Sequence, residues 1–240
     1  MPLARVLDFL YPPACHLCQA PLTHGRYLCP SCRDALPRVT APLCQQCGLP
    51  ADGNIPDGFT CPNCEDQNFA FDFARAAFRA RDGARELVHA FKYRRRIHLH
   101  RELGALAAEA LDDPRITARD GWILVPVPLH WQRRQWRWFN QAEEIAAAMA
   151  RLHNLPITRA LHRSRATPQQ ILLTREQRLR NLKNAFRLTR HERKHRILDG
   201  RPVLLVDDVF TTGSTAHECA KVLKTKAGAE IVVVLTVLRG

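Results

Sequence analysis

Residues Val203-Leu-Leu-Val-Asp-Asp-Val-Phe-Thr-Thr-Gly-Ser-Thr215 decide the fold class of this chain. The four apolar residues at 203–206 predict a buried strand, and a hydroxyl-rich turn then leads into a helix over about 214–226. A strand that is apolar throughout and is followed directly by a helix is typical of a parallel sheet covered on both faces. The stretch therefore predicts an α/β fold.

Strands and helices alternate on both sides of this stretch. Gly228 is expected to end the helix that the stretch opens. The other predicted strands are 73–80, 122–127 and 231–238, and the other predicted helices are 84–93, 103–111 and 140–152. We therefore predict one parallel-sheet domain over residues 67–240.

The turn after the strand at 203–206 has the chemistry of a sugar-phosphate site. Ligands bind outside the carboxyl ends of parallel strands, and the N–H groups at a helix N-terminus bind anions. The carboxylates of Asp207 and Asp208 would accept hydrogen bonds from ribose hydroxyls or help to hold Mg²⁺. The plain alternative is a strand end followed by a helix cap. The turn residues that would hold a phosphate are Thr211, Thr212, Gly213, Ser214 and Thr215.

Eight of the nine cysteines lie near the N-terminus, in four Cys-x-x-Cys pairs. Two such pairs complete a tetrahedral four-cysteine zinc site, and a site made only of cysteine leaves no position for a reactive water. We therefore predict a double zinc ribbon over 9–66 with two structural zinc ions, rather than disulfides or redox pairs. Sequential pairing is the simplest, and interleaved pairing stays open. The pairs are Cys15/Cys18, Cys29/Cys32, Cys44/Cys47 and Cys61/Cys64, while Cys219 is expected to be a buried apolar residue.

Charge and hydropathy narrow the class of protein. The chain of 240 residues carries 36 Lys and Arg against 23 Asp and Glu, a formal charge of +13 that favours polyanionic partners without choosing among them. The longest apolar run, 231–238, is too short to cross a bilayer. Asp8 and the Tyr11-Pro-Pro13 break interrupt any signal-peptide stretch. A cytoplasmic protein without a membrane span is expected.

Three further groups of polar residues lie outside the predicted strands. Arg133 and Arg137 follow the strand at 122–127, where guanidinium groups suit a diphosphate. Two further sequence blocks stand out, Arg137-Trp-Phe-Asn-Gln141 and Arg165-x-Thr-x-x-Gln170. His191-Glu-x-x-His195 matches the zinc-protease pattern, but its charged flanks favour a solvated charge run.

Taken together, the cysteine ribbons, these two blocks and the 207–215 turn resemble the ComF/GntX family, over about residues 9–239. The turn itself resembles the phosphoribosyl pyrophosphate (PRPP) signature of type I phosphoribosyltransferases. The resemblance implies a phosphoribosyltransferase-like domain and a role in handling imported DNA, in competence or in the use of DNA as a nutrient.

The resemblance also implies roles for individual residues. Asp207 and Asp208 would meet the ribose hydroxyls, and residues 211–215 the 5′-phosphate. The residues implied to contact PRPP elsewhere are Arg133, Arg137, Asn140, Arg165 and, as a weaker candidate, Lys92. Two positions depart from the family pattern: Trp138 replaces a glycine of the pyrophosphate loop, and Phe210 replaces an aliphatic residue.

Two function classes follow from these patterns. The first is a phosphoribosyltransferase-like protein that binds PRPP or a nucleotide with Mg²⁺; the sequence decides neither turnover nor the acceptor. The second is a non-catalytic adaptor whose ribbons dock single-stranded DNA or a helicase-like DNA-uptake partner. Mixed aromatic and basic segments at 91–96 and 131–138 are typical of single-strand binding.

Overall fold

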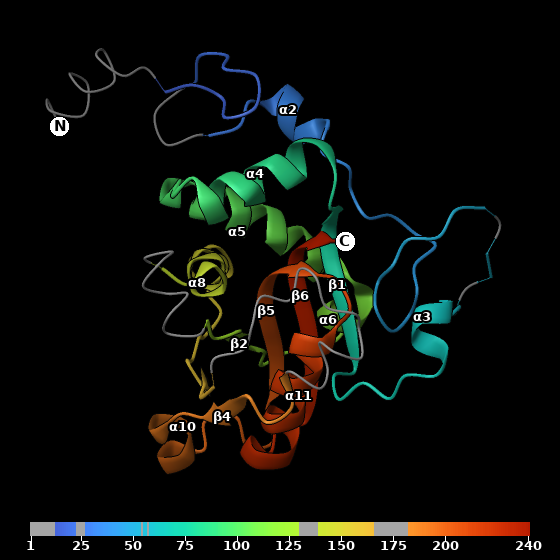
Figure 1. Cartoon of the computed structure of the whole chain (residues 1–240), viewed down its shortest axis with the longest axis vertical. Coiled ribbons are helices and arrows are strands. Elements are labelled where there is room, and N and C mark those ends of the chain that lie inside the picture. The colour runs from blue at the N-terminus through green and yellow to red at the C-terminus, as the bar shows by residue number, and fades with distance from the viewer. Residues whose placement is uncertain (1–12, 23–26, 54, 57, 130–138, 166–181) are drawn as a thin grey trace, which may run out of the picture.

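The computed structural model describes residues 13–22, 27–53, 55–56, 58–129, 139–165 and 182–240 (Figure 1). Its centre is a four-stranded sheet in the order β1-β6-β5-β2, and every neighbouring pair is parallel. The strands are β1 (Phe73–Arg79), β2 (Ile123–Pro126), β5 (Pro202–Phe210) and β6 (Ile231–Arg239). The predicted α/β fold with a parallel sheet is confirmed.

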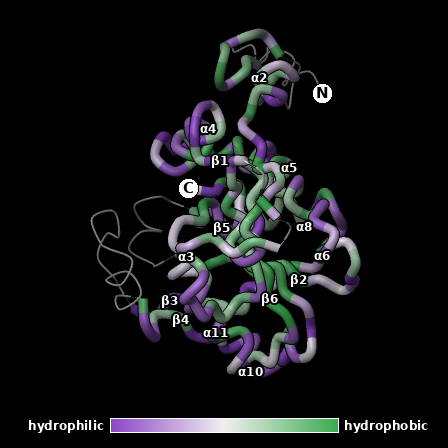
Figure 2. The backbone as a smooth tube through the Cα atoms, turned by 90° about the vertical axis from the view of Figure 1, so that its right-hand side faces the viewer, coloured by the Kyte–Doolittle hydropathy of each residue, from purple (hydrophilic) through white to green (hydrophobic). Residues whose placement is uncertain are grey.

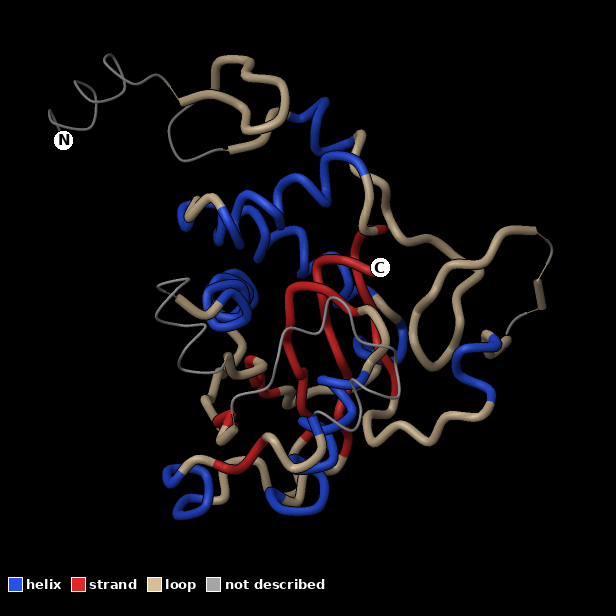
Figure 3. Tube along the Cα trace, in the orientation of Figure 1, coloured by secondary structure: helices blue, strands red, loops and turns tan. Residues whose placement is uncertain are grey.

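Helices cover both faces of this sheet (Figure 3). Successive residues of a strand point to opposite faces. Leu204 therefore packs with the core on one face, while Leu205 packs with the core on the other. The first face is covered by α4 (Asp82–Tyr93), α5 (His100–Ala108) and α8 (Gln141–His153), and the second by α11 (Ser214–Ala227).

The long elements begin and end close to the predicted residues. Gly228 has a φ of +75° and ends α11, as its position after an apolar helix indicates. Cys219 is fully buried on α11, as expected. Figure 2 shows hydrophobic residues concentrated along β2 and β6, whose inner residues have almost no exposed surface. None of the helices in the described ranges is both long and apolar enough to cross a membrane.

Several short elements connect this framework. A two-stranded antiparallel hairpin, β3 with β4, lies beside α11 and was not predicted. The short elements are β3 (Leu161–Arg163), β4 (Phe186–Leu188), α2 (Pro30–Asp34), α3 (Pro62–Glu65), α6 (Pro114–Thr117), α10 (Arg190–His195) and the 3₁₀ turns η1 (Ile97–Leu99) and η2 (Glu109–Asp112).

The cysteine-rich region forms two separate ribbons, which lie in different places (Figure 1). The first packs on α4, where Gly83 lies so close that an added Cβ would be 2.7 Å from Leu17 Cδ1. The second lies against the beginning of β1, where the Ala74 N–H donates to the Gln46 carbonyl over 2.8 Å. A small N-terminal zinc-binding region followed by an α/β domain is thus confirmed, and the exact boundary at residue 66 stays a prediction.

Candidate functional site

The acidic pair lies where β5 extends past its neighbour. β2 pairs with β5 only as far as Val206, whose carbonyl accepts the Val127 N–H over 2.9 Å. Asp207 and Asp208 come next, and the Asp208 N–H donates to Asp207 Oδ1 over 2.9 Å. The carboxylates therefore stand at the carboxyl edge of the parallel sheet, the place where such sheets bind ligands.

The two carboxylates serve opposite faces of the sheet, as alternation along a strand requires. Asp208 Oδ1 lies 2.8 Å from the Lys92 Nζ of α4, and these two side chains are only 12% and 16% exposed. Asp207 instead lines a hollow on the α11 side together with Thr236 of β6. The structure thus brings Lys92, Asp207 and Asp208 to one edge, while their roles toward a ligand stay predictions.

A small polar hollow lies between the end of β5 and the start of α11. Its volume is about 30 Å³, and Asp207, residues 211–215 and Thr236 are among the residues that line it. The Thr212 Oγ1 and Ser214 Oγ are 3.0 Å apart. Because the first N–H groups of a helix lack intrahelical partners, the start of α11 carries partial positive charge beside this hollow. The predicted phosphate turn is therefore a turn at a helix N-terminus.

Gly213 is required by this turn for two reasons. Its φ is +76°, a conformation that favours glycine. An added Cβ would also lie 2.9 Å from Phe210 Cζ and 3.1 Å from Phe69 Cε1. The absence of a side chain therefore makes room for two phenyl rings and also allows the positive φ that the turn needs. Phe210, which departs from the family pattern, therefore fits this turn by packing on its glycine.

The other residues predicted to contact PRPP have different surroundings, and their roles toward a ligand stay predictions. Asn140 is buried and caps α8: its Oδ1 accepts the Ala142 N–H over 3.2 Å, and its Nδ2 donates to the Val127 carbonyl over 3.0 Å. Arg165 follows β3 and donates to the Lys183 carbonyl over 3.3 Å. Arg133, Arg137 and Trp138 lie outside the described residues.

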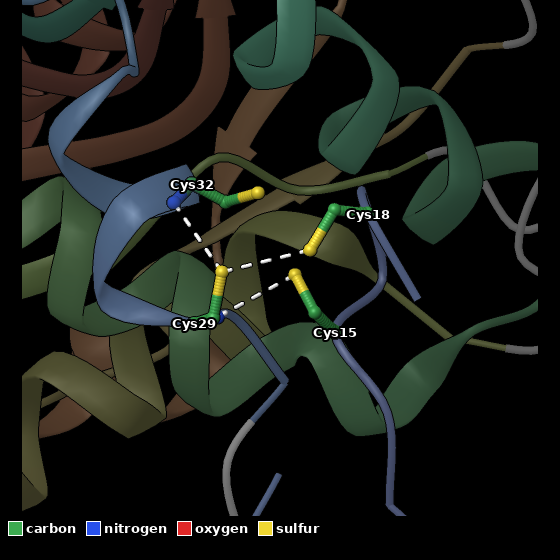
Figure 4. A group of neighbouring side chains, drawn as sticks. All are labelled: Cys15, Cys18, Cys29 and Cys32. Atoms are coloured by element: carbon green, nitrogen blue, oxygen red, sulfur yellow. Dashed lines mark hydrogen bonds between the residues drawn. The ribbon is translucent and has the colours of Figure 1, made fainter. Parts of the chain in front are cut away.

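The eight paired cysteines form two four-cysteine groups, and the pairing is sequential. Within each group all four sulfur atoms lie within 4.8 Å of one another. Figure 4 shows the side chains of Cys15, Cys18, Cys29 and Cys32 pointing toward one another. Sulfur atoms on one tetrahedral zinc would be about 3.8 Å apart, because each Zn–S bond is about 2.3 Å. The Cys18–Cys29 and Cys47–Cys61 sulfur distances, 3.6 and 3.7 Å, fit this arrangement. Both groups fit structural zinc.

Backbone N–H groups favour the thiolate form of one cysteine in each group. Burial raises the pKa of Cys15 and of Cys44, but hydrogen bonds from nearby backbone N–H groups outweigh it. The result is a pKa lowered to about 6 for Cys15 and to about 7 for Cys44. Thiolate is the form that binds metal.

Arg239 is a site residue that the sequence analysis missed. It ends β6, is 7% exposed, and donates through Nε to the Cys47 carbonyl over 3.1 Å. Its Nη2 lies 3.3 Å from Cys47 Sγ, and its Nη1 donates to the Thr211 carbonyl over 3.2 Å. The only sequence signal was a cation directly after the apolar run 231–238. A cavity of about 220 Å³ joins the two regions, lined by Cys47, Asn63, Cys64, Phe69, Phe210, Thr211, Thr212 and Arg239.

The residues of two other sequence patterns, the aromatic and basic segments and the zinc-protease-like pattern, have different surroundings in the folded chain. In the segment 91–96, Phe91 is fully buried and Lys92 faces Asp208, while Tyr93 is 44% exposed and residues 94–96 are exposed. The segment 131–138 lies outside the described residues. In the zinc-protease-like pattern, Glu192 is buried and accepts the Leu198 N–H over 3.0 Å. That glutamate holds a turn, and among the described residues only the two cysteine groups have metal-binding geometry.

Comparisons with known proteins support these features. Residues 6–65 match the double zinc ribbon domain family. The chain is 36% identical to the DNA utilization protein YhgH of Escherichia coli K12, over 92% of this chain and 94% of that protein. It is 30% identical to competence protein F of Haemophilus influenzae, over 85% of this chain and 86% of that protein. Competence protein ComFC of Bacillus subtilis is 25% identical, over 88% of this chain and 84% of that protein.

Among solved structures, the allosteric regulatory enzyme of purine biosynthesis matches 57% of this chain and 25% of its own chain. The sequence identity is 19% and the TM-score is 0.37. This chain therefore spans about a quarter of that enzyme, and a score this low does not establish a shared fold.

Proposed function

The chain belongs to the family of DNA utilization and competence proteins that includes YhgH and competence protein F, and from that premise we propose that it binds PRPP or a nucleotide with Mg²⁺ during the handling of imported DNA. The observation that carries the proposal is the turn 211–215, which joins the acidic end of β5 to the N-terminus of α11. A phosphate accepts hydrogen bonds from such N–H groups and from the hydroxyls of Thr212 and Ser214.

Each part of the site has a distinct task in this proposal. The α11 N-terminus and the polar hollow beside it take the 5′-phosphate. Asp207 lines the same hollow and accepts hydrogen bonds from the ribose hydroxyls. Asp208 holds the Lys92 ammonium at the same edge, so that a cation stands near the charged ligand. Mg²⁺ would be held by carboxylate and phosphate oxygens, and it would neutralise charge on the diphosphate.

Calorimetry with PRPP and with a nucleoside 5′-monophosphate, in the presence and absence of Mg²⁺, tests this proposal. We expect binding by the unmodified chain and a loss of about tenfold or more in affinity for Asp207→Asn, because hydrogen bonds to a charged carboxylate contribute about 1.5–3 kcal/mol. Asp208→Asn should also weaken binding, because it removes the carboxylate that holds the Lys92 ammonium at this edge. Asp120→Asn, an exposed acid outside the site, is the matched control and should bind normally. Absence of binding of both PRPP and a nucleoside 5′-monophosphate by the unmodified chain would refute the proposal. Pyrophosphate release with a panel of nucleobases tests turnover separately.

One exposed surface favours a second candidate function, an adaptor that binds single-stranded DNA. Tyr93 and residues 94–96 form an exposed aromatic and basic surface at the end of α4. Bases stack on rings while cations follow the phosphates in such proteins. Binding measurements on the unmodified chain and on Asp207→Asn discriminate the two candidates. An adaptor would bind single strands in a salt-sensitive way in both chains, and neither chain would bind PRPP.

A further inference from the structure

The second four-cysteine group and the proposed phosphate turn share one guanidinium group. On one side, Arg239 donates to the carbonyl and the sulfur of Cys47 over 3.1 and 3.3 Å. On the other side, its Nη1 donates to the carbonyls of Phe210 and Thr211 over 3.4 and 3.2 Å. Cys47 and Arg239 are 192 residues apart in the sequence, so this contact exists only in the folded chain.

The burial of Arg239, whose guanidinium also donates to the Gly240 carbonyl, favours a negative charge beside it, which a zinc-loaded second group would supply. A cation that is 7% exposed needs a compensating negative charge nearby. Four thiolates around one Zn²⁺ leave about two net negative charges, and Cys47 carries part of that charge. An N–H group that donates to a metal-bound sulfur in turn stabilises the metal site. The zinc centre and Arg239 therefore stabilise each other.

Aromatic packing extends this connection to the glycine of the turn. The Arg239 guanidinium carbon lies 5.1 Å from the centre of the Phe210 ring. That ring meets Phe71 edge to face, with centroids 5.8 Å apart, and Phe71 stacks on Phe69 at 4.6 Å. Gly213 rests against Phe210 and Phe69. A shift of Arg239 would therefore displace the ring on which the turn is packed.

The first four-cysteine group has different surroundings. Its Cys15 and Cys29 accept hydrogen bonds from the backbone N–H groups of Cys29 and Cys32, both over 3.4 Å, and Cys44 of the second group likewise accepts the Cys61 N–H over 3.3 Å. The difference lies in the Arg239 side chain, which donates to Cys47 of the second group. Cys15 belongs to the core on the α4 face of the sheet, whereas the second group and Phe210 belong to the core on the α11 face. The two groups are chemically alike, but among the described residues only the second is joined, through Arg239, to the first residue of the turn.

We propose that zinc in the second group positions the turn 211–215 through Arg239, so that loss of this zinc weakens phosphate binding while loss of the first does not. Arg239 is thus a positioning residue and has no contact with the ligand. The consequence for ligand affinity rests on the proposed function, whereas the consequence for the order of the turn does not. Coupling must also act in reverse, so that a bound phosphate tightens zinc in the second group.

Two matched cysteine variants test the proposal. Cys61 and Cys29 are both N-cap residues of the short helix in their ribbons, α3 and α2. Cys61→Ser and Cys29→Ser should each reduce zinc from two ions to one, measured by atomic absorption. Hydrogen exchange of peptide 207–216 should accelerate only in Cys61→Ser, while a reference peptide in β2 stays unchanged. PRPP affinity should fall about tenfold in Cys61→Ser alone, a usual size for coupled sites.

Two variants of Arg239 separate positioning from mere structural support. Arg239→Met keeps an unbranched apolar stem without the donors, and should weaken zinc binding in the second group by about 10–100-fold while peptide 207–216 exchanges faster. Arg239→Lys keeps the charge and one donor group, so its zinc affinity and its exchange rate should lie between those of the unmodified chain and Arg239→Met. If Arg239→Met does not fold, Arg239→Lys alone provides the test. Equal exchange of peptide 207–216 in Cys61→Ser and Cys29→Ser would overturn the proposal. If the unmodified chain bound neither PRPP nor a nucleoside 5′-monophosphate yet the exchange contrast held, only the proposed function would fail.

Discussion

Lys92 and Asp208 form the ion pair that ties α4 to the acidic end of β5. Because both side chains are mostly buried, removal of one partner leaves the other charge poorly solvated. Lys92→Met should therefore lower the free energy of unfolding by about 2 kcal/mol, somewhat less than is usual for a fully buried pair. The measurement is urea denaturation at pH 7.5.

A double variant supplies the control for this ion pair. Lys92→Met combined with Asp208→Asn removes both charges, and it should recover more than half of the stability lost in Lys92→Met. Equal stability of the single and double variants would show that the pair is not a coupled unit. Arg94→Met, which breaks the exposed pair with Glu86, should change stability by less than 1 kcal/mol, because exposed pairs contribute little.

Individual residues of the site differ in how far the sequence could reveal them. The cysteine pairs and the 207–215 turn are local patterns that the sequence reveals directly. The cysteines pair sequentially, as the simplest interpretation of their spacing predicts, and the turn residues line one hollow. Arg239 has partners 28 and 192 residues away, so no spacing rule identifies it. The sequence makes Lys92 a weaker candidate for a phosphate contact, and that role stays a prediction, whereas its ion pair with Asp208 depends on how α4 packs on the sheet.

At the scale of the element, the start of α11 depends on Gly213. Gly213→Ala introduces strain at a φ of +76° and a clash with Phe210, and it should lower stability by about 2–3 kcal/mol. Gly200→Ala is the matched control, because Gly200 has a φ of +65° with nothing within 4 Å of an added Cβ. It should cost only about 1 kcal/mol. Thermal unfolding compares the two, and similar losses would mean that the phenyl contacts do not constrain the turn.

Element type was predictable wherever the apolar pattern was long. The buried strands and the helices α4, α8 and α11 lie within a few residues of their predicted positions. The β3–β4 hairpin was not predicted, because each strand has only three residues and the two strands are far apart in sequence. It pairs Leu161 with Leu188, and its second strand packs against α11. Short elements of this kind depend on the tertiary fold more than on local propensity.

At the scale of the whole molecule, the two ribbons meet the α/β domain at interfaces that contain partly buried histidines. Desolvation lowers the pKa of His16, His98 and His217 below the ordinary value of 6.5. His98 stacks against Tyr27 of the first ribbon with ring centroids 4.7 Å apart. His217 Nδ1 accepts the N–H of Ala70, in the segment that follows the second ribbon, over 3.1 Å. Desolvation therefore favours the neutral form of each histidine.

This arrangement predicts that the fold loses stability on acidification. Between pH 6.5 and the lower folded pKa values, the unfolded chain binds more protons than the folded chain. Stability is therefore fully present above about pH 6.5 and falls as the pH drops below it. Urea denaturation from pH 8 to pH 5.5 should show this fall, and the triple variant of His16, His98 and His217 to Asn should show a smaller one. Protonation of the zinc-binding thiolates acts in both chains, so the difference in slope isolates the histidines. His153→Asn, at an exposed position, is the control, and identical slopes in the triple variant and the unmodified chain would contradict the argument.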